Sequence, residues 1–341
     1  MLVSVCYTVH SMKAIEIQEF GGPEVLQLGD IDIPVPGAGQ VLIKVAATSV
    51  NRPDVMQREG KYPPPPGDSE IPGLEVAGTI EEFGPDTDGA GLKTGDRVAA
   101  LVGGGGYAEY VVAHVGHCFH LPESVSFEEG ACLCETYITA YLNVIELGAL
   151  KDGESVLLHG GGGGVNTSAI QIVAALRPGA TMFVTASTGK VERVRELGVE
   201  HVIDYKQTEF ADEIRTLTSK KGIDVILDHI GGPYLQANLK TLALSGRLVL
   251  IGVMGGINSE INLAVFMVKR QQLLGSVLRS RPVPEKSAII ARYVEAVMPH
   301  VDSAAIRPLI SNTLPLADAA EGHRLMESGK HFGKIVLSVV D

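Results

Sequence analysis

A run of glycines separates two apolar segments near the middle of the chain. Gly160 to Gly164 follow the segment SVLLH and lead, through VNT, into the amphipathic segment SAIQIVAAL. A strand, a glycine-rich turn and a helix in this order let the backbone approach a pyrophosphate, whose charge then faces the free amides of the helix N-terminus. The pattern predicts a dinucleotide site, with a flexible linker as the alternative. The expected contact residues are Gly161, Gly163, Gly164 and Val165.

The glycine fingerprint is incomplete. In the frame Gly-x-Gly-x-x-Gly the three positions are Gly161, Gly163 and Asn166, so the third glycine is missing. That glycine usually permits close packing of the helix on the strand.

The segment after the next apolar stretch, TMFVT, carries hydroxyl groups and a cation. At about 20 residues beyond the glycine loop, an NAD site places an acidic residue on the ribose 2′-hydroxyl. Here the chain has Ser187, Thr188 and Lys190, with no carboxylate among them. Hydroxyls and an ammonium can bind a 2′-phosphate, so NADPH is the expected cofactor. A solvated turn is the alternative.

Two kinds of segment must position these residues. From Lys13 to about Leu121, β-rich runs alternate with turn clusters, and only the stretch from Arg52 to Arg58 has weak helical periodicity. After about Cys132, strands alternate with helices, which predicts βαβ units and a parallel sheet. We expect an α/β protein with a β-rich domain at 12–132 and 282–341, a doubly wound domain at 133–281 and an extension at 1–11.

Composition limits the possible partners. Lys and Arg number 28 and Asp and Glu number 40, a net charge of -12, which disfavours nucleic acid and anionic membrane surfaces. No apolar stretch is long enough to span a membrane. The cysteines are too few and irregular for a disulfide framework, so a reducing cytoplasm is the expected location.

Several motifs in order carry a family resemblance. They are NRPDVMQREGKY at 51–62, PGLEVAG at 72–78, GDRV at 95–98, DHIGG at 228–232, GVMGG at 252–256, LRSR at 278–281 and GKIV at 333–336. From Met12 onward the chain resembles the zinc-free quinone oxidoreductases (zeta-crystallin-like) of the medium-chain dehydrogenase/reductase superfamily, particularly the stress-inducible NADPH:quinone oxidoreductases. The resemblance implies a GroES-like catalytic domain, a Rossmann domain and a homodimer in which the strand at 272–278 pairs with its symmetry mate.

The resemblance also implies roles for individual residues. Tyr62 and Asn51 would donate hydrogen bonds to the developing phenolate of the substrate, although Tyr62 also fits a loop tyrosine packing on the prolines at 63–66. Thr139 would lie near the nicotinamide, or be an ordinary helix threonine. The remaining implied cofactor contacts are Tyr205 at the adenosine end, Gly252, Met254 and Gly255 beside the nicotinamide, and Lys334.

The resemblance further implies that no zinc is bound. Zinc-dependent relatives place ligands near Asn51, Leu74 and Cys134, and only the last of these can hold the metal here. Catalytic zinc normally takes three protein ligands. Cys132 and Cys134 are therefore expected to be small buried residues, with redox sensitivity of the pair as the alternative.

Three functions follow from these expectations. The first is NADPH-dependent quinone reduction, which needs no metal because a quinone is already an electrophile. The second is reduction of an enone or alkenal double bond, which also needs a proton donor. The third is non-catalytic NADPH binding by a crystallin-like protein. The expected partners are a small electrophile and a second copy of the chain.

Overall fold

The computed structural model describes residues 11–339, which form two units. The first unit contains residues up to Glu135 and from Ile310 onward, and the second runs from Thr136 to Leu309. The segment at 1–10, most of the expected N-terminal extension, lies outside the described residues. Across 11–339, no helix is long and apolar enough to cross a membrane.

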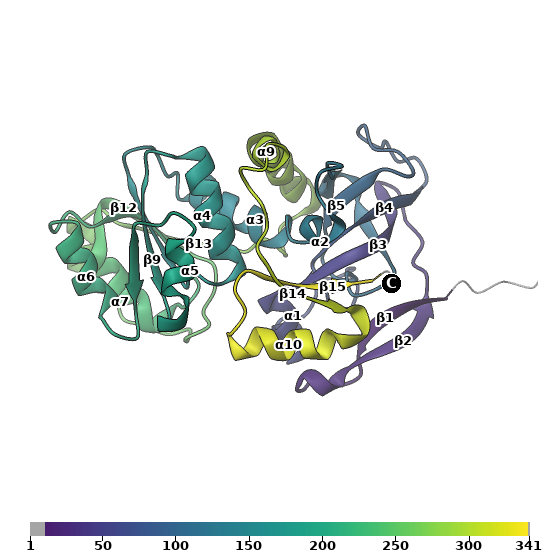
Figure 1. Cartoon of the computed structure of the whole chain (residues 1–341), viewed down its shortest axis with the longest axis horizontal. Coiled ribbons are helices and arrows are strands. Elements are labelled where there is room, and N and C mark those ends of the chain that lie inside the picture. Colours follow the sequence, from purple (N-terminus) through teal and green to yellow (C-terminus); the bar gives the residue numbers. More distant parts are fainter. Residues whose placement is uncertain (1–10, 340–341) are drawn as a thin grey trace, which may run out of the picture. The chain divides into compact units, whose positions relative to one another are not determined.

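The first unit is rich in antiparallel strands (Figure 1). Its strands are β1 (Ser11–Ile17), β2 (Leu26–Asp32), β3 (Gln40–Val50), β4 (Glu75–Phe83), β5 (Arg97–Leu101), β6 (Tyr110–His114), β7 (Cys118–His120), β14 (Ile310–Pro315) and β15 (Lys334–Ser338). Its helices are α1 (Arg52–Arg58), α2 (Phe127–Gly130) and α10 (Ala319–Ser328). The larger sheet has the order β14-β15-β3-β4-β5-β7, and β6 also pairs with β3. The C-terminal strand β15 therefore completes a sheet begun near the N-terminus.

The second unit is a parallel sheet with helical connections. Its strands are β8 (Ser155–His159), β9 (Thr181–Ala186), β10 (His201–Asp204), β11 (Ile223–Asp228), β12 (Leu242–Leu250) and β13 (Gln272–Gly275). Its helices are α4 (Gly164–Leu176), α5 (Val191–Arg195), α6 (Phe210–Leu217), α7 (Gly232–Thr241), α8 (Leu263–Val268) and α9 (Val283–Asp302), while α3 (Glu135–Ala140) crosses the boundary between the units. The order β10-β9-β8-β11-β12-β13 confirms the predicted doubly wound sheet.

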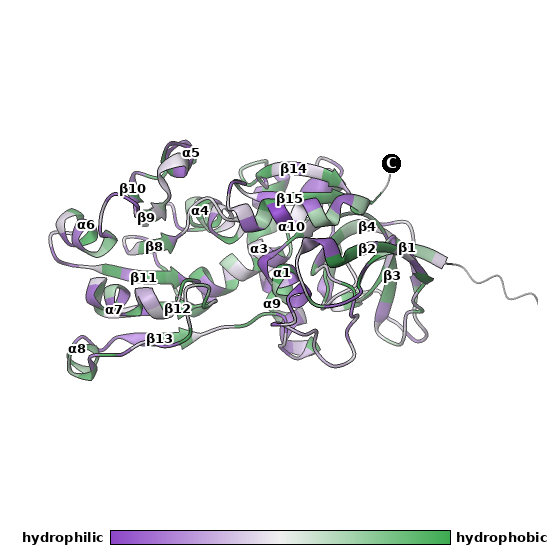
Figure 2. Cartoon of the chain, turned by 90° about the horizontal axis from the view of Figure 1, so that it is seen from below, coloured by the Kyte–Doolittle hydropathy of each residue, from purple (hydrophilic) through white to green (hydrophobic). Residues whose placement is uncertain are grey.

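The central strands of this sheet are apolar because both of their faces are covered. β8 and β11 read SVLLH and IDVILD, and both are largely green, the colour of hydrophobic residues, in Figure 2. Leu157, Phe183 and Ile226 are buried in one apolar cluster. This core holds the carboxyl ends of the strands in fixed register.

The unit boundaries differ from the predicted domain limits. The sequence assigns 282–341 to the first domain, whereas the second unit extends to Leu309 and includes α9. Contacts within the second unit explain this placement: the rings of Tyr141 and Tyr293 lie 5.9 Å apart, and Arg292 Nε donates to Glu146 Oε1 at 2.6 Å.

Candidate functional site

The strand order of the second unit reverses direction at β8. From β8 the chain proceeds outward through β9 and β10, then crosses to β11 on the other side of β8. Ligands of open α/β sheets bind outside the carboxyl ends of the strands at such a switch point. The glycine run follows β8 directly, so it lies at this position.

The glycine loop leaves backbone donors at the start of α4. Gly163 precedes the helix and has no side chain to cap it, and within the described residues the amides of Gly164 and Val165 have no acceptor. A Cβ on Gly161 would lie 2.4 Å from Val184 Cγ1, so only glycine fits this close approach to β9. Free amides at the positive end of a thirteen-residue helix are suited to binding an anion.

Asn166 takes the place of the missing third glycine. Its side chain is buried, and its Nδ2 donates to the carbonyl oxygens of His159 and Gly160, the latter at 3.1 Å. The amide therefore ties the first turn of α4 to the end of β8.

A polar and cationic group follows β9. Ser187 precedes a short 3-10 turn, Thr188–Lys190, which leads into α5. Lys190 forms no ion pair with any described carboxylate, and partial burial together with the neighbouring Arg193 lowers its pKa. A half-buried cation without an internal counter-charge is suited to an anionic ligand.

Tyr205 is brought to the same edge by backbone pairing. Its amide donates to the carbonyl of Ala186, the last residue of β9, at 3.2 Å, and its ring is exposed. Lys206 Nζ lies 5.3 Å from the centroid of that ring. Arg193 and Lys206 were missed by the sequence reasoning. The spacing of Arg193, three residues after Lys190 at the start of a helix, is the signal that could have identified it.

The loops after β11 and β12 complete this edge of the sheet. Gly231 and Gly256 form a parallel bridge, and the amides of Met254 and Gly255 donate to the carbonyls of His229 and Ile230 at 3.1 and 2.8 Å. The Met254 side chain is 55% exposed. The predicted nicotinamide residues Gly252, Met254 and Gly255 therefore share one loop at the carboxyl edge. Thr139, in α3, is half-buried, and its carbonyl accepts a 2.7 Å hydrogen bond from Asn143 Nδ2.

In the first unit, Asn51 and Lys334 lie in a buried cluster around Glu75. The two amide hydrogens of Asn51 are directed to Glu75 Oε1 at 2.9 Å and to the Ser49 carbonyl at 3.3 Å. Lys334 Nζ donates to Asn51 Oδ1 at 2.6 Å, Glu75 Oε1 at 2.9 Å and the Val50 carbonyl at 3.4 Å.

These contacts correct two sequence expectations. Lys334 is 2% exposed and its three ammonium hydrogens have acceptors, so here it is a structural cation rather than a cofactor contact. Asn51 is 3% exposed and its amide has no hydrogen left for a substrate oxygen. Tyr62 lies half-buried in the segment between α1 and β4, where Gln57 Nε2 donates to the Glu70 carbonyl at 2.8 Å.

The residues at the positions of zinc ligands do not suit a metal. Asn51 is saturated by protein contacts, Leu74 is apolar and buried, and Cys134 is the only thiol of the three positions. No group of three or more His, Cys, Asp or Glu side chains that could hold a metal occurs within 11–339. Cys132 and Cys134 are buried, as expected, and burial raises the pKa of both thiols, which disfavours reactivity.

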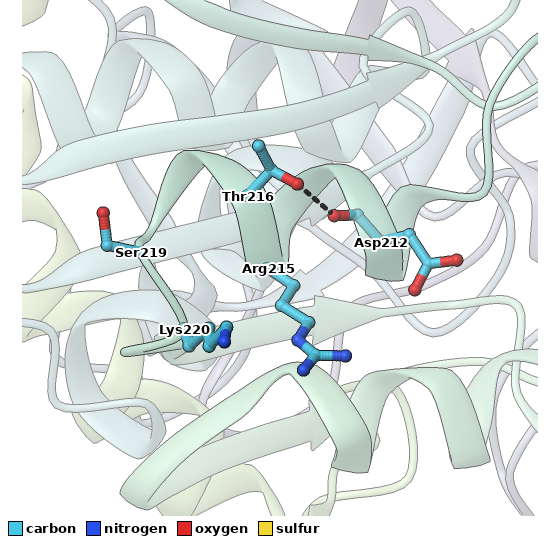
Figure 3. Close-up of a pocket in the computed structure, with 5 residues that line it drawn as sticks. All are labelled: Asp212, Arg215, Thr216, Ser219 and Lys220. Carbon is cyan, nitrogen blue, oxygen red and sulfur yellow. Dashed lines mark hydrogen bonds between the residues drawn. The ribbon is translucent and has the colours of Figure 1, made fainter.

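A separate hollow lies along α6 (Figure 3). It is open to solvent and is lined by Asp212, Arg215, Thr216, Ser219 and Lys220. The helix runs from the carboxyl end of β10 toward the start of β11, so its last turn lies toward the amino edge of the sheet. The hollow is therefore distinct from the switch point, and none of the predicted site residues lines it.

Comparisons with known proteins agree with both units. Residues 37–123 match the alcohol dehydrogenase GroES-like domain, and residues 197–337 match a family model described as zinc-binding dehydrogenase. Human quinone oxidoreductase is 36% identical over 330 residues, covering 96% of this chain and 97% of the relative.

Solved structures also share the fold of this chain. The mycobacterial protein Rv1454c, solved in complex with NADPH, is 30% identical with a TM-score of 0.85, covering 96% of this chain and 100% of that one. CurK enoyl reductase is 27% identical with a TM-score of 0.84, covering 96% and 99% of the two chains. These matches confirm the GroES-like and Rossmann-type fold class.

Proposed function

Because the chain belongs to the quinone oxidoreductase (zeta-crystallin-like) family of the medium-chain dehydrogenase/reductase superfamily and is an oxidoreductase, we propose that it reduces quinones with NADPH, without a metal ion. The observation that carries this proposal is Lys190, a half-buried cation without a carboxylate partner in the described chain, beside the carboxyl end of β9. The family binds pyridine nucleotides, and this cation favours the phosphorylated form.

The second unit supplies the groups that would hold NADPH. The amides of Gly164 and Val165 would bind the pyrophosphate at the start of α4. Ser187, Thr188 and Lys190 would bind the 2′-phosphate, with Arg193 adding positive charge. When bound, the nicotinamide supplies a hydride to an electrophile. The loop containing Met254 offers exposed apolar surface for the ring.

The first unit supplies Tyr62 as the proposed hydrogen-bond donor to the substrate. A quinone oxygen gains negative charge as the ring accepts a hydride, and a donor placed in advance stabilises that charge. Asn51 is committed to Glu75 and Lys334, so its proposed role changes from donor to support for the start of α1. Tyr62 would also have to protonate carbon if the substrate were an enone.

The enone or alkenal alternative has a specific observation in its favour, the similarity to CurK enoyl reductase. Competition separates the two functions: NADPH oxidation is measured with a 1,2-quinone and an alkenal together and singly. We expect the quinone to have the larger kcat/KM. A larger value for the alkenal would replace quinone reduction by double-bond reduction. NADPH binding without oxidation by either class would favour the non-catalytic alternative.

A homodimer is part of the proposal. β13 ends the strand order of its sheet, and an unpaired edge strand can pair with a second copy. Nearby, apolar side chains are strongly exposed, namely Ile257, Leu263, Met267 and Val268. Light scattering should give a molar mass twice that of one chain. The double variant Leu263→Glu with Met267→Glu should have the molar mass of a single chain. A wild-type monomer at micromolar concentration would contradict the dimer.

A cytoplasmic location completes the proposal. Cys118, Cys132 and Cys134 are free thiols, which suits a reducing compartment. Fractionation of cells that produce the protein should place it with cytoplasmic markers.

A further inference from the structure

A row of buried polar groups lies beneath the glycine loop. Thr185 Oγ1 is 3.2 Å from His159 Nδ1, His159 Nε2 is 2.7 Å from Asn238 Oδ1, and Asn238 Nδ2 donates to Asp228 Oδ2 at 3.0 Å. These four residues, called the polar row below, come from β9, β8, α7 and β11. Each is at most 1% exposed, so every hydrogen bond in the row counts energetically.

The donors and acceptors of the row fit one arrangement of hydrogens. Asn238 uses Nδ2 to donate to the Asp228 carboxylate, so its Oδ1 must accept from His159 Nε2. A neutral imidazole has one N–H, so Nδ1 accepts from the hydroxyl of Thr185. The same hydroxyl oxygen accepts from the Gly160 amide at 3.1 Å.

The surroundings of His159 favour this neutral form. Burial is the main reason that its pKa is lowered from 6.5 to about 3; the hydrogen bond with Asn238 opposes this shift, and the neighbouring His229 adds to it. The ring contacts Phe210 and Tyr234 edge-to-face, with centroids 4.8 and 4.9 Å away. Orientation and protonation are therefore both fixed.

Both ends of the row reach loops of the candidate site. Gly160 begins the glycine loop with a φ of +79°. Asp228 accepts from the amides of Ile230 at 2.7 Å and Gly231 at 3.3 Å, in the loop that follows β11. A Cβ on Gly160 would lie 2.9 Å from His229 Cε1, so the two loops are in close contact at the switch point.

We propose that His159 is a positioning residue that holds the loops after β8 and β11 in register for the dinucleotide through its Nε2–H tautomer. The inference rests on the proposed function, because it assigns these loops to NADPH. His159 does not contact the reacting atoms. Its effect is on cofactor affinity, transmitted through Thr185 and Gly160 at one end and through Asp228 at the other.

The first experiment measures NADPH affinity by fluorescence titration, together with kcat, KM and melting temperature. His159→Phe keeps the aromatic contacts and removes both hydrogen bonds. We expect the Kd of NADPH to rise about tenfold, with kcat at saturating NADPH and KM for quinone within about twofold of wild type. The matched control is Leu239→Ala, which removes a buried apolar side chain adjacent to Asn238 and makes no change in the row. It should lower the melting temperature and leave the Kd unchanged.

Exchanging the amide and the carboxylate provides a rescue test. Asn238→Asp alone places two carboxylates next to each other and should weaken NADPH binding more than His159→Phe does. The double variant Asp228→Asn with Asn238→Asp keeps every hydrogen bond of the row. The new aspartate at 238 accepts from His159. The new asparagine at 228 accepts from the amides of Ile230 and Gly231 and donates its side-chain N–H to the aspartate at 238. This double variant should recover affinity to within about threefold of wild type.

The tautomer of His159 can be measured in the wild-type protein, so this test does not depend on whether a variant folds. Long-range ¹H–¹⁵N spectra of the histidine rings should show His159 as the neutral Nε2–H tautomer from pH 5 to pH 9. An Nδ1–H tautomer, titration in that range, or equal rises in Kd for His159→Phe and Leu239→Ala would overturn the inference. If wild-type protein bound neither NADPH nor NADH, the proposed function and this inference would fail together. Tight wild-type binding that His159→Phe leaves unchanged would overturn the inference alone.

Discussion

Breaking the buried ion pair of the first unit should destabilise that unit strongly. Lys334 and Glu75 are 2% and 0% exposed and lie 2.9 Å apart. Removing one member of such a pair leaves an uncompensated buried charge and costs about 3–5 kcal/mol. The expected loss from either single substitution is therefore a large part of the stability of a typical domain.

The contacts of each partner rank the two substitutions. In Lys334→Met, the Glu75 carboxylate keeps the donors Ser49 Oγ, Asn51 Nδ2 and the amides of Cys134 and Glu135, so the loss should be near about 3 kcal/mol. In Glu75→Gln, the ammonium loses its anion and an NH₂ group faces other donors, so the loss should approach about 5 kcal/mol. The double variant should cost about 2 kcal/mol less than the sum of the two.

Urea unfolding followed by circular dichroism measures these losses, and hydrogen exchange of β15 assigns the transition to the first unit. Lys44→Met is the matched control, because Lys44 is an exposed lysine of β3 and should change stability by less than about 0.5 kcal/mol. A loss below about 1 kcal/mol for Lys334→Met, or strict additivity in the double variant, would refute the reasoning.

The same pair predicts the direction of a pH effect. Burial alone would lower the pKa of Lys334, but the Glu75 carboxylate raises it above the usual 10.5. A raised pKa in the folded state means that the stabilisation is complete below pH 10.5 and is lost as the pH rises through the folded value. Unfolding measured from pH 8 to pH 12 should therefore show a decline that Lys334→Met reduces.

Three further predictions test the proposed function. Lys190→Ala should raise the Kd of NADPH roughly ten- to a hundredfold, the equivalent of one charge-assisted contact of about 1.5–3 kcal/mol, and leave NADH nearly unchanged; equal losses in titrations of both cofactors would show that Lys190 does not bind the 2′-phosphate. Prolonged chelation should leave quinone reduction intact, whereas inactivation that zinc reverses would contradict a metal-free reaction. Tyr62→Phe should lower kcat on the order of tenfold with NADPH affinity unchanged, because a donor to the developing charge is lost while the ring remains, and full activity would limit Tyr62 to a structural role.

The fold was predictable because its signals are local in the sequence. A helix at Arg52–Arg58, the strand before the glycine run and the helix after it follow from hydrophobic period and turn residues within a few positions of each other. The alternation of strands with helices then limits the sheet to a doubly wound order, since crossovers between parallel strands have one hand.

Partners of buried polar residues were not predictable in this way. Lys334 donates a hydrogen bond to Asn51, which lies 283 positions away in the sequence. A local sequence pattern cannot predict such a distant acceptor. The motifs that contain Asn51 and Lys334 indicated a family. The family resemblance also implied that Lys334 contacts the cofactor, and the buried contacts of this lysine do not fit that role. His159 shows the same limit, because its partners Thr185 and Asn238 are 26 and 79 positions away.

Asn166 shows why the incomplete glycine fingerprint still predicted the correct turn. The third glycine serves a geometric purpose, the close packing of helix on strand, and a residue with a side chain can meet the same need if its polar atoms bond to the strand end. Asn166 does so through Nδ2, at the cost of an Oδ1 that has no protein partner in the described chain. The amides of Gly164 and Val165, which we propose bind the anion, lie at the helix N-terminus, whereas Asn166 packs against the strand end. In this chain the third position of the fingerprint therefore serves packing, while the proposed ligand contacts lie at other positions of the loop.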